Sequence, residues 1–141
     1  MKTILGVIIT HNPDIKLLKK NIVSFIDSVN AVIIIDNDSK TIEELFSFET
    51  DKISVLSNKT NLGIADALNQ ALVHAQKNHF DFILTMDQDS FFECDTIQDL
   101  LFGFKNDKTA IVCPSLKDMN SHHFDLVSEE YSEIFTAITS G

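Results

Sequence analysis

Short runs of β-branched residues alternate along this chain with stretches of helical periodicity, and this alternation limits the possible folds more than any other feature. Strands are predicted, in chain order, at residues 4–9, 31–35, 53–56, 80–86 and 110–113. The run at 31–35 is almost entirely Val and Ile, as expected for a strand that is buried on both faces. Alternating strands and helices are typical of βαβ units. We therefore predict an α/β fold in which helices flank a mostly parallel sheet.

The segments between these runs carry helix signals. Asn12 is a predicted N-cap, and Pro13 suits the first helical position. Thr41 and Glu44 form a predicted capping box for a short helix that continues to Phe48. The apolar faces expected at helical spacing are Ile15, Leu18, Ile22 and Phe25 in the first helix, Ala65, Leu68, Leu72 and Ala75 in a helix after residue 63, and Ile97, Leu100, Leu101 and Phe104 in the last helix, which Asp95 or Thr96 would cap.

The length and apolar content are those of one folded domain. The chain has 141 residues, of which 44% are hydrophobic, and this is enough for one core. Residues 1–114 carry the βα units, whereas the periodicity weakens over 115–141, apart from a candidate strand at 134–138. We therefore predict a single domain over 1–141 whose core units end at 114. Because the chain stops on Ser140–Gly141 directly after an apolar run, we expect a longer native chain.

The charge balance argues against one large class of partners. The sequence has 21 acidic and 11 basic residues, a formal net charge of −10, and every basic residue is Lys. Nucleic acids are held by clustered Lys and Arg, with Arg reading the base edges, so a nucleic-acid partner is not expected. A chain without Arg needs another way to neutralise a phosphate ligand. A metal ion held by carboxylates would do so.

Cysteine content and hydropathy bear on the cellular compartment in which the protein is expected. Cys94 and Cys113 are too few for a disulfide framework and too far apart for the usual four-ligand zinc spacing, so we interpret both as reduced packing residues. The N-terminal apolar run lacks the length and cleavage site of a signal peptide. No run approaches the ~20 apolar residues that span a bilayer. A cytoplasmic location is therefore predicted.

Four polar clusters follow the C-terminal ends of predicted strands. They are residues 10–12, 36–39, 58–63 and 87–90. One such cluster would be ordinary helix capping, but four together favour a ligand site, because ligands of open α/β sheets bind at this edge. Neither the G-x-G-x-x-G turn of dinucleotide-binding proteins nor the P-loop motif occurs. NAD-dependent enzymes and P-loop NTPases are therefore not expected.

Asp87 and Asp89 are the sharpest chemical signal. They follow the apolar strand at 80–86 and lie two residues apart, so in an extended segment both side chains point to the same side. Two carboxylates so close repel each other unless a proton or a cation joins them. Mg²⁺ or Mn²⁺ fits, because each accepts one or two protein carboxylates and completes its shell with water and substrate phosphates. The alternative is that Asp89 only caps a turn.

Together these segments resemble a known family. The matching segments are VIITHNP at 7–13, IDNDS at 35–39, NLGIA at 61–65 with Ala67 and Asn69, and TMDQDS at 85–90. In these segments the sequence is similar to the N-terminal, nucleotide-sugar-binding part of family 2 glycosyltransferases, which have the Rossmann-like GT-A fold. The DQDS segment, and ITSG at 138–141, are most similar to the rhamnosyltransferase branch of that family.

The resemblance implies a donor-binding set and a metal site. The donor-binding set is Thr10, His11, Asn12, Asp36, Asn61, Gly63 and Asp87. Within it, Asp36 would accept the ring N–H of uracil or thymine, and Asp87 would face the ribose or a metal-bound water. Asp89, together with Asp87, would bind Mg²⁺ or Mn²⁺ on the diphosphate, where the cation also stabilises the leaving nucleoside diphosphate.

The activity that the resemblance implies is sugar transfer, from dTDP-rhamnose or a UDP-sugar to a hydroxyl of a glycan or lipid-linked acceptor, with inversion at the anomeric carbon. In the family the general base lies beyond the position of Gly141, so no catalytic residue is assigned. Residues 115–141 would begin the acceptor side, and this chain would hold the donor site alone. A lipid-linked acceptor would bring it to the inner face of the membrane by peripheral contact. An uncovered apolar run at 134–138 would favour homo-oligomers.

Two alternatives stay open on the sequence. A haloacid-dehalogenase-like phosphatase also has an apolar strand that ends in Asp-x-Asp, and its first Asp, here Asp87, is the nucleophile. That motif normally stands near the N-terminus of its fold, whereas Asp87 follows three earlier predicted strands. The other alternative is a nucleotide-sugar-binding module without transferase activity, which the missing general base favours.

Overall fold

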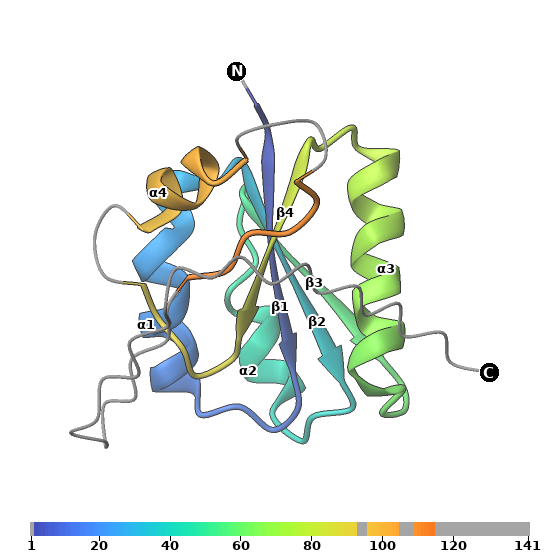
Figure 1. Cartoon of the computed structure of the whole chain (residues 1–141). Helices are drawn as coiled ribbons and strands as arrows, with labels where there is room; N and C mark the ends of the chain where they lie inside the picture. Colours follow the sequence, from blue (N-terminus) through green and yellow to red (C-terminus); the bar gives the residue numbers. More distant parts are fainter. Residues whose placement is uncertain (1, 93–95, 105–108, 115–141) are drawn as a thin grey trace, which may run out of the picture. The chain divides into compact units, whose positions relative to one another are not determined.

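The computed structural model describes residues 2–92, 96–104 and 109–114 of a chain that separates into two compact units, residues 1–99 and 100–141. Its elements are β1 (Ile4–Thr10), α1 (Ile15–Phe25), a 3-10 helix η1 (Ile26–Ser28), β2 (Ala31–Asn37), α2 (Ile42–Phe46), β3 (Ile53–Asn58), α3 (Gly63–Lys77), β4 (Phe82–Asp87) and α4 (Thr96–Phe102) (Figure 1). None of the helices in these three ranges has the length and apolar character of a membrane span. The domain boundary at residue 114 stays a prediction.

The first unit is built on a four-stranded sheet in which every pairing is parallel. The strand order is β3-β2-β1-β4, which confirms the predicted α/β fold. From β1 the chain moves outward to β2 and β3, and then crosses back to place β4 on the other side of β1. The order therefore reverses between β1 and β4. Ligands of open α/β sheets bind at such a reversal, outside the carboxyl ends of the strands.

Helix α3 packs against one face of the sheet through small side chains. Ala67, Ala71 and Ala75 of α3 are buried in one cluster with apolar side chains of β1 and β2, which are Leu5, Val7, Ile33 and Ile35. The predicted face is thus partly wrong, because Ala65 is exposed and Leu72 is 46% exposed. Three alanines spaced four residues apart form a smooth stripe on the helix. We infer that this stripe lets the helix backbone lie close to the sheet, where Leu side chains would hold it away.

Helix α1 lies on the opposite side of the sheet from α3 (Figure 1). Leu18, Ile22 and Phe25 are buried, as predicted from their helical spacing. The ring of Phe25 lies against β1 at Gly6, where an added Cβ would come within 2.6 Å of the ring atom Cε2. A glycine inside this strand therefore provides room for an aromatic side chain of α1.

Two predicted helix caps are wrong. The N-cap of α1 is Asp14, whose Oδ1 accepts from the backbone N–H groups of Lys16 (2.8 Å) and Leu17 (3.1 Å). The predicted cap Asn12 has a positive φ of 48° instead. The capping box at the start of α2 does not form, because the buried Thr41 hydroxyl has no hydrogen-bond partner among the described residues.

The predicted strand at 110–113 is also wrong. The structure has irregular backbone over 109–114, where Ile111 is 79% exposed and Cys113 is exposed, so Cys113 is not a packing residue. A β-branched run forms a strand only where it can pair and pack, and these residues pair with no described strand. Cys94, Asp95 and the candidate strand at 134–138 lie outside the described residues.

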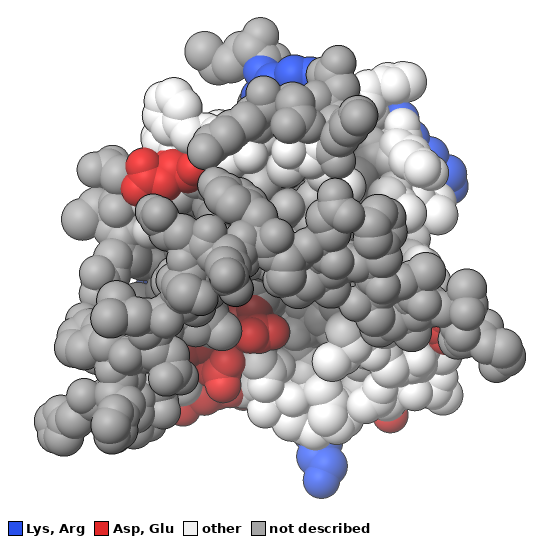
Figure 2. Space-filling model, viewed as in Figure 1, with Lys and Arg blue, Asp and Glu red and all other residues white. Residues whose placement is uncertain are grey.

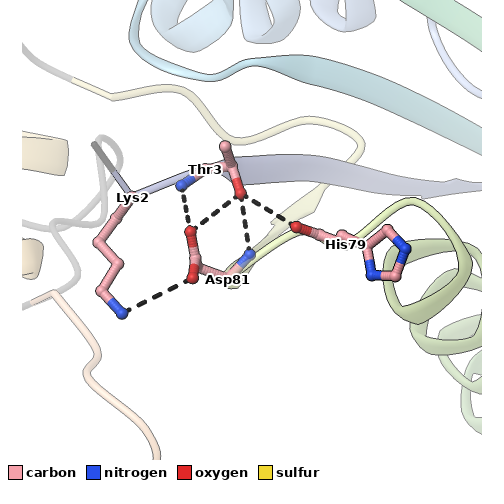
Figure 3. A network of polar contacts seen from close by, with 4 residues as sticks. All are labelled: Lys2, Thr3, His79 and Asp81. Atoms are coloured by element: carbon pink, nitrogen blue, oxygen red, sulfur yellow. Dashed lines mark hydrogen bonds and ion pairs between the residues drawn. The ribbon is translucent and has the colours of Figure 1, made fainter.

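At the amino edge of the sheet, a small polar network joins the start of β1 to the turn before β4 (Figure 3). The backbone N–H of Thr3 donates to Asp81 Oδ2 (2.7 Å), and its hydroxyl donates to the same oxygen (3.0 Å). Lys2 Nζ lies 3.6 Å from Asp81 Oδ1. These contacts, led by the backbone hydrogen bond from Thr3, hold the pKa of Asp81 below its usual 3.8.

We predict that Asp81→Asn lowers the free energy of unfolding at neutral pH and that this difference from the wild type disappears in acid. A carboxylate with a lowered folded-state pKa stabilises the protein above its unfolded pKa, and the gain is lost as the pH falls through the folded value. Urea unfolding at pH 7 and well below pH 3.8 measures the difference. Asp51→Asn, an exposed carboxylate before β3, is the control. An unchanged difference at both pH values would contradict the prediction.

Candidate functional site

A cleft of about 860 Å³ opens over the carboxyl ends of β1 and β4, beside the start of α3. It therefore lies at the reversal of strand order. The predicted site residues that line it are Thr10, His11, Asn61, Gly63, Asp87 and Asp89. Figure 2 shows a group of acidic side chains in the lower part of the view, the side toward which the strands of Figure 1 point. Asn12 and Asp36, which were also predicted, do not line the cleft.

Asp36 lies one layer behind the cleft and is fully buried. Its Oδ1 accepts from the hydroxyls of Thr10 (2.8 Å) and Ser39, and its Oδ2 accepts from the backbone N–H of Ser39 (2.9 Å). The parallel register places Thr10 directly beside Asp36. The carboxylate therefore joins the end of β1 to the loop after β2. In this arrangement Asp36 offers no exposed oxygen to a base, so the contact that the resemblance implies stays a prediction.

His11 is held in one tautomer on the cleft wall. Its Nδ1 lies 2.7 Å from the backbone oxygen of Asn37, and a carbonyl only accepts, so Nδ1 carries the proton. Its Nε2 then accepts from the Asn12 amide (3.1 Å). The backbone N–H of His11 donates to Gln88 Oε1 after β4 (2.9 Å). One residue thus connects the loops that follow β1, β2 and β4.

Asn12 fixes the loop geometry around this histidine. Its backbone N–H donates to Ser39 Oγ (2.7 Å), and its Oδ1 accepts from the backbone N–H of Lys40 (3.0 Å). The positive φ of Asn12 turns the chain between β1 and α1. Asn12 therefore positions His11 and does not itself face the cleft.

Sequence reasoning missed Asn37, which lines the cleft beside His11. Its Nδ2 donates to the backbone oxygen of Gly63 (3.1 Å), and its Oδ1 accepts from Asn58 Nδ2 (2.9 Å). The backbone N–H of Gly63, which has a positive φ of 82°, donates to Asn61 Oδ1 (2.9 Å). Because β2 continues through residue 37, Asp36 and Asn37 point to opposite sides of the strand. That alternation was the available signal.

Asp87 and Asp89 are exposed on the cleft wall at the end of β4. Neither carboxylate makes a hydrogen bond or ion pair with another described residue. Within the described ranges no group of three His, Cys, Asp or Glu could hold a metal ion, so no third side chain of these types from those ranges joins Asp87 and Asp89. That donor set fits Mg²⁺ or Mn²⁺ that is completed by water and phosphate oxygens.

A parallel α/β sheet with a carboxylate-bearing cleft at its strand-order reversal is the arrangement in which open α/β proteins bind their ligands. Comparison with known families names the class: residues 7–134 match the model of "Glycosyl transferase family 2". The chain belongs to this family, and its fold agrees with the expected GT-A type. The match leaves the phosphatase alternative without support.

A curated relative is similar to most of this chain. It is the dTDP-rhamnosyl transferase RfbF of Shigella flexneri, which is 26% identical over 122 residues. The aligned region covers 86% of this chain and 41% of the relative. The chain thus spans about two fifths of the length of the relative that it matches.

Proposed function

We propose that the cleft binds a nucleoside-diphosphate sugar and that the protein transfers the sugar to a hydroxyl of a glycan or lipid-linked acceptor, with inversion. One observation carries the proposal: in a family 2 chain, loops after all four strands place polar groups around one cleft. The rhamnosyl relative favours dTDP-rhamnose as the donor, with a UDP-sugar as the second candidate. A lipid-linked acceptor would place the protein at the cytoplasmic face of the membrane.

The cleft residues divide into a nucleoside side and a diphosphate side. His11 and Asn61 offer a ring face and an amide beside Gly63, where the backbone can approach a nucleotide closely because no side chain stands in the way. Asp87, at the end of β4, and Asp89, two residues further on, also line the cleft. A bound Mg²⁺ or Mn²⁺ would supply neutralisation of the diphosphate and of the charge that develops on the leaving group. By fixing the position of the cation, the two carboxylates would fix the position of the donor's diphosphate and so orient the donor.

We predict that this chain binds dTDP and UDP in the presence of Mg²⁺ and binds ADP at least about 10-fold more weakly. A base contact that contributes about 1.4 kcal/mol to the binding free energy gives that ratio. A purine base presents a different set of hydrogen-bonding groups to the cleft wall than uracil or thymine does. Isothermal titration calorimetry with the three nucleotides measures it. Equal affinity for ADP would contradict the pyrimidine assignment, and the absence of any nucleotide binding would contradict the proposed donor site.

Release of dTDP from dTDP-rhamnose upon addition of an acceptor glycan distinguishes a transferase from a binding module. Binding without acceptor-dependent release would favour the module.

A further inference from the structure

Helix α1 contacts both ends of the segment that carries the two carboxylates. Asn21 Nδ2 donates to the backbone oxygen of Asp87 (2.5 Å), and the backbone N–H of Phe92 donates to Ser24 Oγ (3.1 Å). In Figure 1 the chain that leaves β4 runs alongside α1. The segment 87–92 is therefore attached at its first and last residues to one helix.

A third contact lies between these two. Lys20 Nζ is 3.5 Å from the centroid of the Phe91 ring, within the range of a cation–π interaction. Lys20, Asn21 and Ser24 occupy neighbouring positions on the surface of α1, since residues three and four apart meet on one side of a helix.

Asn21 lowers the stability of the folded protein compared with an aliphatic residue at the same position, which suggests a role other than packing. It is fully buried in α1 next to Leu18, Ile22 and Phe25, where an aliphatic side chain would complete the apolar face. Its Oδ1 is buried and has no hydrogen-bond partner among the described residues. A buried amide oxygen without a partner destabilises the folded state. What Asn provides here, and an aliphatic residue does not, is the hydrogen bond to Asp87.

The backbone hydrogen bonds of the sheet do not extend beyond Asp87. The parallel ladder between β1 and β4 ends at the pair Ile9 and Asp87. Past that pair, the segment is held by a turn from the Ser90 N–H to the Asp87 oxygen (3.3 Å) and by the Gln88 side chain on His11. The Asp89 carboxylate makes no hydrogen bond or ion pair with a described residue, so we infer that its direction follows from the backbone on either side.

We infer that Asn21 and Ser24 are positioning residues that fix the backbone of segment 87–92 and thereby the directions of the Asp87 and Asp89 carboxylates. The ligand in this inference, a metal-bound nucleoside diphosphate, rests on the proposed function. Neither residue lines the cleft. Both act on the ligand through the segment that they hold.

The first test is Asn21→Leu, which removes the hydrogen bond to Asp87 and also the unpaired amide oxygen. The affinity for dTDP in Mn²⁺, measured by calorimetry, is expected to fall about 10-fold, as is typical when a residue that orients a metal ligand is lost. The thermal midpoint is expected to stay equal or rise. Asn78→Leu is the matched control, because the Asn78 amide also donates to a backbone oxygen, that of His74, far from the cleft. A folded Asn21→Leu protein with wild-type affinity would overturn the inference.

The second test uses Ser24 and does not depend on nucleotide binding. Hydrogen–deuterium exchange at amides 88–92 is expected to speed up in Ser24→Ala and to return toward the wild-type rate in Ser24→Thr, which keeps a hydroxyl. If the wild-type protein binds no metal–dTDP, the proposed function fails and exchange decides the inference. A faster rate restored by Thr supports it, and an unchanged rate in Ser24→Ala overturns it.

Discussion

Replacing Asp89 by Asn is expected to lower the metal-dependent affinity for dTDP by at least roughly 10- to 100-fold. Substituting residues that merely orient a metal ligand already lowers metal affinity by roughly that factor. The two exposed carboxylates are the acidic groups on the cleft wall, in a chain with no Arg to hold a diphosphate. An amide oxygen carries no net charge and is a weaker ligand for Mg²⁺ than a carboxylate. With one charge removed, the remaining carboxylate of Asp87 holds the cation poorly.

Calorimetric titration of dTDP with Mn²⁺, with Mg²⁺ and with EDTA measures the effect. Asp27→Asn is the matched control, since Asp27 is exposed just before β2, at the amino edge of the sheet and away from the cleft. Both substitutions remove one negative charge from the protein, so an effect of net charge alone would appear in both variants. Wild-type binding that is equal in EDTA and in Mn²⁺ would show that the carboxylate pair does not act through a metal.

The positions of the four observed strands were predictable from their apolar runs, which are continuous in β1 and β2 because these two strands are buried on both faces. Their carboxyl ends were not. Asp36, Asn37 and Asp87 belong to β2 and β4, although hydrophobicity stops before them. The apolar pattern of a sequence reflects which side chains are buried, whereas the end of a strand is set by its last backbone hydrogen bonds to the neighbouring strand. The predicted strands therefore stopped one or two residues short at the edge where the site lies.

The general place of the cleft was predictable from topology, whereas the side chains that line it were only partly predictable. Polar clusters after parallel strands must share one edge, and six of the eight predicted residues do line one cleft. Which side chain in a cluster faces that cleft depends on strand alternation and on local partners. Asp36 turns inward to Thr10 and Ser39, and its neighbour Asn37 takes the cleft position.

Asp36→Ala is expected to lower the free energy of unfolding by at least about 3 kcal/mol. Three donors, the hydroxyls of Thr10 and Ser39 and the Ser39 N–H, lose their acceptor in a fully buried site, and each buried donor left unpaired costs about 1–3 kcal/mol. In a domain of this size such a loss lowers the thermal midpoint by roughly 10 °C. Urea unfolding and a thermal scan measure it, with Asp38→Asn as the control at the exposed position two residues further on.

The nucleotide preference of Asp36→Asn separates the two roles that this residue can have. Asn keeps the size of the side chain and one acceptor oxygen for Thr10 or Ser39, but it presents an N–H group where the carboxylate had its second oxygen. If Asp36 only holds the loops, the variant is less stable, and dTDP and UDP still bind more tightly than ADP. If the carboxylate accepts the ring N–H itself, the preference over ADP disappears while stability changes little. A stable variant without that preference would thus restore the base contact implied by the family resemblance and require the buried carboxylate to turn toward the cleft when a nucleotide binds.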